Sequence, residues 1–324
     1  MKKYSVAIRT LGTSGDLLKR ELQSLQRQTV RPQKVVIYIA EGYRRPSFTV
    51  ADEQYIYVKK GMVAQAALDY DEIDTELILK LDDDVEFTKD DDVENLIKAL
   101  EEEDYDVVVV DTFKNHKMSV GAKMYNTFTN FNFPRFWGQC AFKIHANGSF
   151  SYLNNPVNNV YITESGAGPC ALWKKKSILA IHLKDELWLD TLGFSYGDDQ
   201  VIFQKVVRNG GKMAAYFHSG IVHLDGKTSS GIYHRDVVKF QTRAMGQYLL
   251  WHRSIYSAST TLFRKMWCLS CLLIKVMWQI PVHCIAAVKF RSAKIPFYYL
   301  CGILKGMEFT KSKAYKSLPS YLLK

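Results

Sequence analysis

The chain has 324 residues, of which 47% are hydrophobic and 23% are charged, as in ordinary folded proteins, so extensive disorder is excluded. The formal net charge of +10 is unevenly distributed, because residues 69–105 are acidic whereas residues 285–324 are basic and rich in large apolar side chains. A basic and apolar tail suits an anionic lipid surface, and without a recognisable nucleic-acid-binding motif we expect no nucleic-acid partner.

The first third of the chain alternates between strand and helix patterns. Apolar runs predict strands at 4–8, 34–39, 55–58, 77–81 and 107–110, and helical spacing predicts helices at 16–28, about 62–71 and 91–102. Strands that alternate with helices form βαβ units, so we expect a mostly parallel sheet.

The rest of the chain changes character twice. Residues 112–165 are expected to form irregular strands and loops, followed by a strand at 170–173, a helix at 199–208 and a strand at 213–217. From about residue 232 the pattern is helical, and residues 262–304 hold apolar stretches separated by Pro281 and by the basic patch 289–294. Lys275 and His283 are costly in hydrocarbon, so this region is expected on, or shallowly in, a membrane surface. The alternative is that these helices pack on the catalytic part of the chain.

Three carboxylates, Asp82, Asp83 and Asp84, directly follow the apolar run 77–81. Open α/β sheets bind ligands beyond the carboxyl ends of their strands. Adjacent carboxylates repel each other, and a divalent cation with oxygen ligands, Mg²⁺ or Mn²⁺, would relieve that repulsion and hold a diphosphate. The alternative is a solvated acidic loop or a helix cap.

A second acidic pair, Asp198 and Asp199, begins the predicted helix at 199–208. Carboxylates at a helix start interact favourably with the helix dipole, which is sufficient reason for their presence. An ionised carboxylate there is also suited to accept the proton of an attacking hydroxyl. His223 follows the last predicted strand; a lone histidine is more often structural, although neutral imidazole is a suitable ligand for Mn²⁺.

The order and spacing of these motifs resemble those of inverting family 2 glycosyltransferases with the GT-A fold, over about residues 4–230. Residues 5–10 and 26–29 look like parts of the family's opening βαβ unit, and residues 168–175 are similar to the strand before its acceptor site. The triple aspartate with the later acidic pair and histidine is also similar to galactofuranose-transferring members.

The resemblance implies an α/β fold of the GT-A type, Rossmann-like with a mostly parallel central sheet, and a helical C-terminal extension that faces a membrane. Residues 1–231 would be the catalytic domain, with a nucleotide-sugar-binding half at 1–111 and an acceptor-binding half at 112–231. Residues 232–324 would form the helical, basic and apolar C-terminal region.

The resemblance also implies an activity, which is transfer of a sugar from a nucleoside-diphosphate-sugar, expected to be a UDP-sugar, to a hydroxyl of a glycan or lipid-linked acceptor. Such an enzyme would serve cell-surface polysaccharide synthesis. Because the amino terminus carries no signal-peptide pattern, we expect a cytoplasmic protein at the inner face of the cell membrane.

The resemblance assigns roles to individual residues. Asp199 would be the catalytic base and Asp198 would position the acceptor. The residues implied to hold Mn²⁺ or Mg²⁺, a Lewis acid for the departing diphosphate, are Asp82, Asp84 and His223. Thr10, Glu41, Asp82 and Asp83 would contact the nucleotide-sugar, Glu41 standing where the family has an acidic pair. Trp173 would be an apolar platform for the acceptor or, alternatively, a core side chain.

Two other functions compete with this interpretation. A metal-dependent nucleotidyltransferase also uses carboxylates on an α/β sheet, but residues 9–16 match its Gly-rich phosphate loop only weakly. A non-catalytic sugar- or metal-binding module at a membrane would explain the triple aspartate but not the pair Asp198 and Asp199.

Overall fold

The computed structural model describes residues 2–112, 140–153, 156–192, 197–224 and 237–323. The chain divides into two compact units, the first made of Met1–Lys117, Asn155–Thr191 and Gly210–Asp225, the second of the remainder. This division differs from the linear domains expected from the sequence, because the described residues 140–153 and 197–209 group with the C-terminal helices. The expected boundary at 231 lies outside the described residues.

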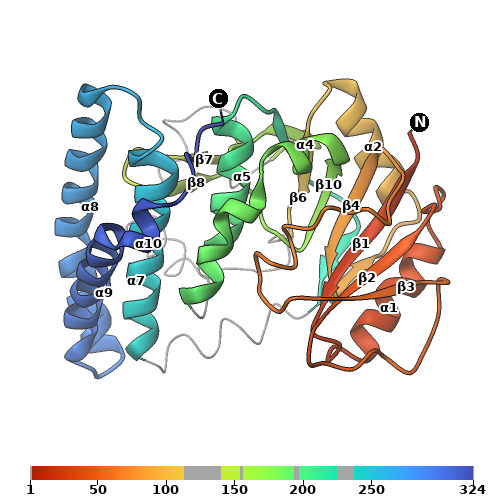
Figure 1. Cartoon of the computed structure of the whole chain (residues 1–324), viewed down its shortest axis with the longest axis horizontal. Coiled ribbons are helices and arrows are strands. Elements are labelled where there is room, and N and C mark those ends of the chain that lie inside the picture. Colours follow the sequence, from red (N-terminus) through yellow and green to blue (C-terminus); the bar gives the residue numbers. More distant parts are fainter. Residues whose placement is uncertain (1, 113–139, 154–155, 193–196, 225–236, 324) are drawn as a thin grey trace. The chain divides into compact units, whose positions relative to one another are not determined.

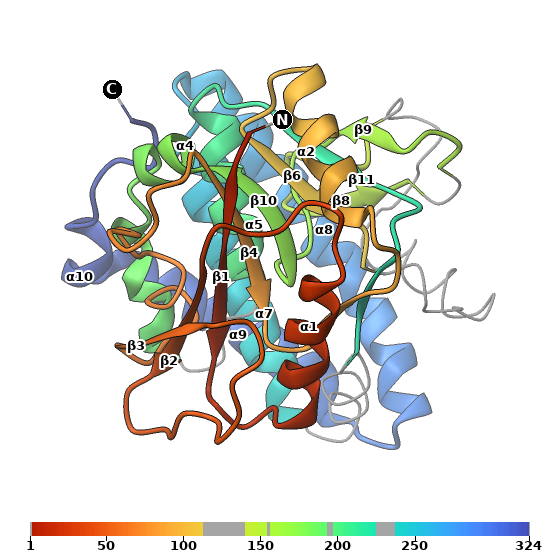
Figure 2. The same ribbon diagram turned by 90° about the vertical axis from the view of Figure 1, so that its right-hand side faces the viewer.

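The first unit contains an eight-stranded sheet in the order β3-β2-β1-β4-β10-β6-β11-β9 (Figure 2). Its strands are β1 (Tyr4–Thr10), β2 (Val35–Ala40), β3 (Gln54–Val58), β4 (Leu77–Asp82), β6 (Val107–Val110), β9 (Val160–Ile162), β10 (Cys170–Lys174) and β11 (Met213–Tyr216). The neighbours β1–β2, β2–β3, β1–β4 and β6–β11 are parallel, while β10 is antiparallel to both neighbours and β9 to β11. The α/β class with a mostly parallel central sheet is therefore confirmed, as is the helical C-terminal region.

The central strands are mostly apolar because both faces of the sheet are covered. Strands β2 and β6 are buried at every position. Helix α1 (Asp16–Gln26) buries Leu18, Leu22 and Leu25, and helix α2 (Asp92–Glu102) buries Leu96, Ile97 and Leu100. A fully buried aliphatic side chain contributes roughly 1.5–3 kcal/mol, so these stripes hold the helices on the sheet. The unit also contains α4 (Lys175–Ala180) and the 3₁₀ segment η3 (Leu183–Leu192).

The helix predicted near residues 62–71 is absent from the structure, where this segment forms turns. Two backbone N–H groups, those of Val63 and Ala64, donate to the carboxylate of Asp190 at 3.0 and 2.9 Å. Gln65 donates from its side-chain amide to the carbonyl oxygens of Thr10 and Tyr38. The segment keeps local backbone bonds, such as that from the N–H of Ala67 to the carbonyl oxygen of Val63 at 2.8 Å, but these long-range bonds hold it as a series of turns.

The second unit contains a short hairpin and the C-terminal helices (Figure 1). The elements are β7 (Phe142–Ile144), β8 (Phe150–Tyr152), α5 (Asp198–Arg208), α7 (Val237–Trp251), the π-helical η4 (His252–Tyr256), α8 (Leu262–Lys289), α9 (Lys294–Lys311) and α10 (Lys313–Lys316). Helices α7 and α9 pack closely because glycines replace bulky residues at their contact: a Cβ at Gly302 would clash with the carbonyl of Gln241, and one at Gly306 would lie 2.8 Å from Tyr248.

Helix α8 continues through Pro281, where the sequence predicted a separation between two apolar stretches. A proline inside a helix removes one hydrogen bond and costs about 3 kcal/mol. Burial on both sides of the proline, at Leu272 and Ala286 for example, offsets that cost.

Candidate active site

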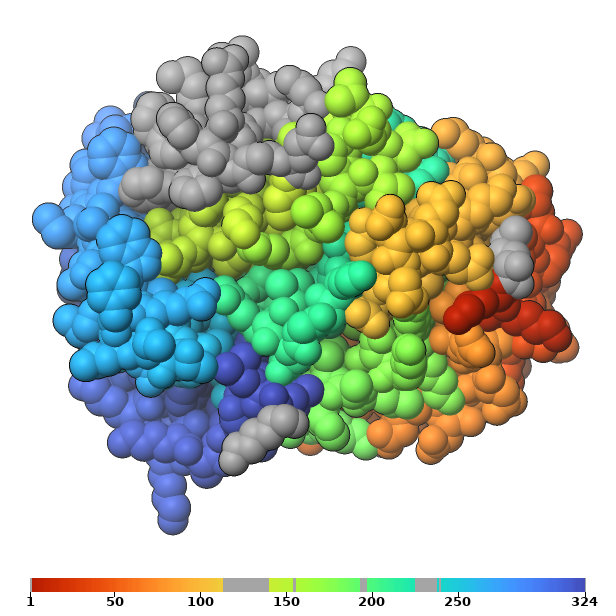
Figure 3. Space-filling view, turned by 90° about the horizontal axis from the view of Figure 1, so that it is seen from above, coloured from red at the N-terminus to blue at the C-terminus, as the bar shows by residue number. Residues whose placement is uncertain are grey.

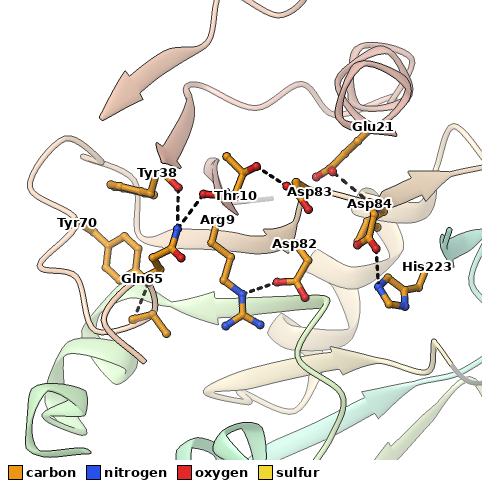
Figure 4. A network of polar contacts seen from close by, with 12 residues as sticks. Arg9, Thr10, Glu21, Tyr38, Gln65, Tyr70, Asp82, Asp83, Asp84 and His223 are labelled. Atoms are coloured by element: carbon orange, nitrogen blue, oxygen red, sulfur yellow. Dashed lines mark hydrogen bonds and ion pairs between the residues drawn. The ribbon is translucent and has the colours of Figure 1, made fainter. Parts of the chain in front are cut away.

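A cluster of polar side chains in the first unit lies at the carboxyl ends of two neighbouring parallel strands, β1 and β4 (Figure 4). In the register of β1 and β4, Arg9 lies opposite Asp82. The Nε atom of Arg9 donates to Oδ1 of Asp82, which forms a partly buried ion pair. The loops that follow β1 and β4 therefore meet at one edge of the sheet, as expected for parallel strands.

Asp83 connects these two loops. The hydroxyl of Thr10 donates to Oδ2 of Asp83, and the backbone N–H of Gly12 donates to the same hydroxyl oxygen at 2.7 Å. Burial raises the pKa of Asp83, against the lowering effect of hydrogen bonds from Ser14 and Thr10, and the charges of the two neighbouring aspartates raise the pKa further. Thr10 and Asp83, both predicted to contact the nucleotide-sugar, thus form one contact between the loops.

Asp84 and His223 are far apart in the sequence but adjacent in space. The short strands β5 (Val85–Phe87) and β12 (Ile221–His223) pair antiparallel, with His223 opposite Val85. The Nε2 atom of His223 lies 3.0 Å from Oδ2 of Asp84, and the backbone N–H of Leu224 donates to the carbonyl oxygen of Asp84 at 2.8 Å. The second carboxylate oxygen of Asp84, Oδ1, is buried and has no hydrogen-bond partner among the described residues.

Glu21 is a member of this cluster that sequence reasoning missed. It extends from α1 and is fully buried, and Oε2 accepts a hydrogen bond from the N–H of Val85 at 3.4 Å. Its Oε1 atom has no partner within the described part of the chain. Burial raises the pKa of Glu21 well above its ordinary value despite the Val85 bond, and the charges of the three aspartates raise the pKa further. The protonated form of Glu21 is therefore favoured beneath the aspartate turn.

A signal for Glu21 was present in the sequence. Together with Leu18, Leu22 and Leu25 it occupies the i, i+3, i+4 and i+7 positions of one helix face. A carboxylate on an apolar face needs a partner in the interior.

The predicted metal ligands are only partly assembled. Asp84 contacts His223, whereas the carboxylate of Asp82 is paired with Arg9. Among the residues that the structure describes, no group of three or more His, Cys, Asp or Glu side chains has the arrangement to hold a metal ion. Asp84 and His223 fit a divalent cation as a two-residue pair, since a carboxylate and an imidazole are suitable donors and Asp84 Oδ1 is buried without a partner among the described residues. The Oδ1 atom of Asp82, the third predicted ligand, is held by Arg9.

Two further predicted residues have different surroundings. Glu41 directly follows β2, where its backbone N–H donates to the carbonyl of Val58 at 2.8 Å and its side chain is exposed. Trp173 is only 1% exposed, in β10 between β4 and β6, and its ring centroid lies 5.7 Å from the Nζ atom of Lys80. The structure corrects the platform prediction for Trp173, because a buried core ring offers no surface to an acceptor.

Asp198 and Asp199 belong to the second unit, where they form the first turn of α5. Gly197 precedes them with a φ of 97°, in the left-handed region that glycine adopts readily. Asp198 is buried and Asp199 is partly exposed. Residues 193–196, which complete the predicted motif, lie outside the described residues, and the catalytic roles of both aspartates stay predictions.

No protein-family model matches the chain, and no curated protein sequence matches it. Among solved structures, the chain is similar to the mannosyltransferase PcManGT from Pyrobaculum calidifontis in complex with GDP-Man and Mn²⁺. The two share 13% sequence identity, the match covers 96% of this chain and 88% of that chain, and the TM-score is 0.46. A likeness at this level does not bear on activity, so the function of this chain is inferred from its own residues.

Proposed function

We propose that the chain is a divalent-metal-dependent glycosyltransferase that uses a nucleoside-diphosphate-sugar. The observation that supports this proposal best is the contact between Asp84 and His223 at the carboxyl end of β4, next to the contact between Thr10 and Asp83. An open α/β sheet binds nucleotides at such strand ends. The Oδ1 atom of Asp84, which has no partner among the described residues, gives this edge an acceptor that a cation would satisfy.

The residues for the donor follow from their positions at the strand ends. Thr10 and Glu41 lie at the ends of β1 and β2 and would contact the nucleoside. The guanidinium of Arg9 is a fixed positive charge on the aspartate turn. A diphosphate would compete with Asp82 for this guanidinium, and the displaced Asp82 carboxylate would then be available as a further metal ligand.

The chemical step would use the two aspartates of α5. When bound, the cation supplies positive charge to the departing diphosphate. Asp199 accepts the proton of the acceptor hydroxyl, and the N-terminus of α5 favours its ionised form. Asp198 positions the acceptor.

The finer parts of the proposal rest on the motif resemblance to family 2 glycosyltransferases, including those that transfer galactofuranose. They are an inverting displacement, a UDP-sugar donor, Mn²⁺ or Mg²⁺ as the metal, and a glycan or lipid-linked acceptor. Cell-surface polysaccharide synthesis at the cytoplasmic face of the membrane is the proposed setting.

The first experiment is a thermal-shift screen of nucleoside diphosphates and their sugars with Mn²⁺. A stabilising nucleotide-sugar is then incubated with the enzyme, and its breakdown is followed with and without chelator. Release of a nucleoside diphosphate that stops in EDTA and returns with Mn²⁺ or Mg²⁺ supports the proposal. Release of pyrophosphate from a nucleoside triphosphate and a sugar 1-phosphate would instead indicate a nucleotidyltransferase, and full activity in EDTA would exclude the metal.

The role of Asp199 is tested by Asp199→Asn, which should bind the donor almost normally and lose at least about 100-fold in transfer rate, because a positioned base contributes roughly 10²–10⁴-fold. The matched control is Asp74→Asn, at an exposed acid of the first unit. Near-normal transfer by Asp199→Asn would remove Asp199 as the base.

A further inference from the structure

Helix α8 has its polar and apolar sides reversed relative to a helix of a water-soluble protein. Its buried positions include Lys275, Gln279 and His283, which are 4%, 3% and 9% exposed. Its outward side carries large apolar residues, among them Ile274 at 60% and Met277 at 70% exposure. A helix that buries its polar residues and exposes its apolar residues is suited to contact with an apolar environment.

The apolar outer face of α8 is continuous. At 100° per residue, the exposed positions from 266 to 288 fall on one broad arc of the helix, opposite its buried positions. None of these exposed residues is charged. The large apolar side chains exposed on this arc are Met266, Trp267, Leu273, Ile274, Met277, Trp278, Ile285 and Val288. Side chains of this helix also form part of the molecular surface in the space-filling view (Figure 3).

Two of the buried polar side chains of α8, Lys275 and His283, have partners inside the second unit. Lys275 donates from Nζ to the carbonyl oxygen of Asn147 at 3.4 Å. The ring of His283 hydrogen-bonds the carbonyl oxygen of Gln279 at 2.7 Å and stacks on Tyr299 at a centroid distance of 4.2 Å. These residues, which from the sequence argued against burial in lipid, therefore face the protein and leave the outer face without charged side chains.

The positions of the charged residues and of the exposed tryptophans in α8 indicate which apolar environment contacts this face. Basic residues lie at both ends of α8, and the only acid between residues 262 and 324 is Glu308. The outward tryptophans Trp267 and Trp278 are of the type enriched at membrane interfaces. An anionic lipid surface matches both properties, because juxtamembrane Lys and Arg residues are attracted to its negative potential.

We propose that the outer face of α8 binds an anionic lipid bilayer, with the helix lying in the membrane plane. By length and composition the 28-residue helix is also able to cross a membrane. Helix α9, however, packs beside α8 (Figure 1) and exposes Lys305 and Glu308, which would be placed in hydrocarbon if the pair spanned the bilayer. An in-plane helix keeps these charges in water.

The first test is co-sedimentation of the full chain with vesicles of phosphatidylcholine and phosphatidylglycerol. The variant Ile274→Glu/Met277→Glu should lower vesicle binding by at least about tenfold, because two exposed apolar anchors become charged. The control Val157→Glu/Ile162→Glu makes the same charge change at exposed apolar residues of the first unit and should bind as the parent does. Replacing phosphatidylglycerol with phosphatidylcholine should also weaken binding.

Three results would overturn the proposal. One is equal vesicle binding by the α8 variant and the control, and another is equal binding to neutral vesicles. The third is a parent that forms dimers, ignores vesicles and becomes monomeric in the α8 variant, because the face would then bind a second copy. Circular dichroism of both variants excludes unfolding as the cause. The readout involves no nucleotide-sugar, so it stands or fails independently of the proposed transferase activity.

The depth of α8 distinguishes an in-plane helix from a spanning one. Tryptophan fluorescence is measured with lipids brominated at shallow or deep acyl positions, and the differences after Trp267→Phe and after Trp278→Phe isolate each ring. The two rings are about eleven residues apart, about 16 Å along a helix. In-plane binding predicts the same shallow quenching for both rings, whereas quenching of the two rings at different depths would refute that orientation.

Discussion

Glu21 offers a test of the site that needs neither substrate nor metal. The change is Glu21→Gln, which keeps the shape of the side chain and an oxygen to accept the hydrogen bond from Val85. Burial raises the pKa of Glu21 well above the ordinary 4.5, and the nearby aspartates add to this effect. The folded protein therefore holds a proton that the unfolded chain releases above about pH 4.5.

The magnitude follows from proton linkage. Between the unfolded and the folded pKa the native state binds one more proton, so the free energy of unfolding falls by about 1.4 kcal/mol for each pH unit as pH rises. The stabilising contribution of Glu21 is complete below the pKa that this residue has in the unfolded chain. It is lost as the pH rises towards the pKa of Glu21 in the folded protein. The amide introduced by Glu21→Gln does not titrate and lacks this slope, so the variant gains stability relative to the parent through the same window.

The assay is urea unfolding in EDTA at intervals from about pH 5 upward, for the parent, for Glu21→Gln and for the control Glu103→Gln at an exposed carboxylate. The difference between Glu21→Gln and the parent should grow with pH, at up to about 1.4 kcal/mol per unit. Parallel curves for these two proteins would refute the conclusion that burial raises the pKa of Glu21.

Substitutions at three positions test the packing that supports the site and α8, each by chemical denaturation. Gly12→Ala should lower the free energy of unfolding by about 2 kcal/mol, since Gly12 has a φ of 71° and a Cβ there would clash with the carbonyl of Arg44; a neutral effect would contradict this. Asp190→Ala should cost about 1–3 kcal/mol because two N–H groups lose their acceptor, and Asp190→Asn should cost less. Pro281→Ala should stabilise the chain by about 1 kcal/mol or more, and destabilisation would show that α8 needs its proline.

The sequence predicts the central strands of the first unit well because they are mostly apolar. The turns at residues 61–71 escape prediction, because their geometry depends on Asp190, more than 120 positions away. The meeting of Asp84 and His223 follows from motif order, whereas the pairing of Asp82 with Arg9 depends on strand register. Local composition carries no information about such long-range contacts.

The orientation of side chains sets a second limit on sequence reasoning. Lys275 and His283 argue against lipid contact when only their presence in α8 is known, yet both face the protein interior. The periodicity of α1 places Glu21 on the apolar face of the helix, but only the structure shows that its carboxylate meets the N–H of Val85. Trp173 is equally compatible with a sugar platform and with a core, and only its burial separates the two.

The central claim is that Asp84 and His223 together hold a divalent cation, and pulsed electron paramagnetic resonance of bound Mn²⁺ tests it most directly. Nitrogen modulation from a coordinated imidazole should be present in the parent protein with a nucleoside diphosphate. It should disappear in His223→Gln, and Asp84→Asn should weaken Mn²⁺ binding by at least about tenfold. Bound Mn²⁺ without nitrogen modulation, or modulation that persists in His223→Gln, would contradict the account.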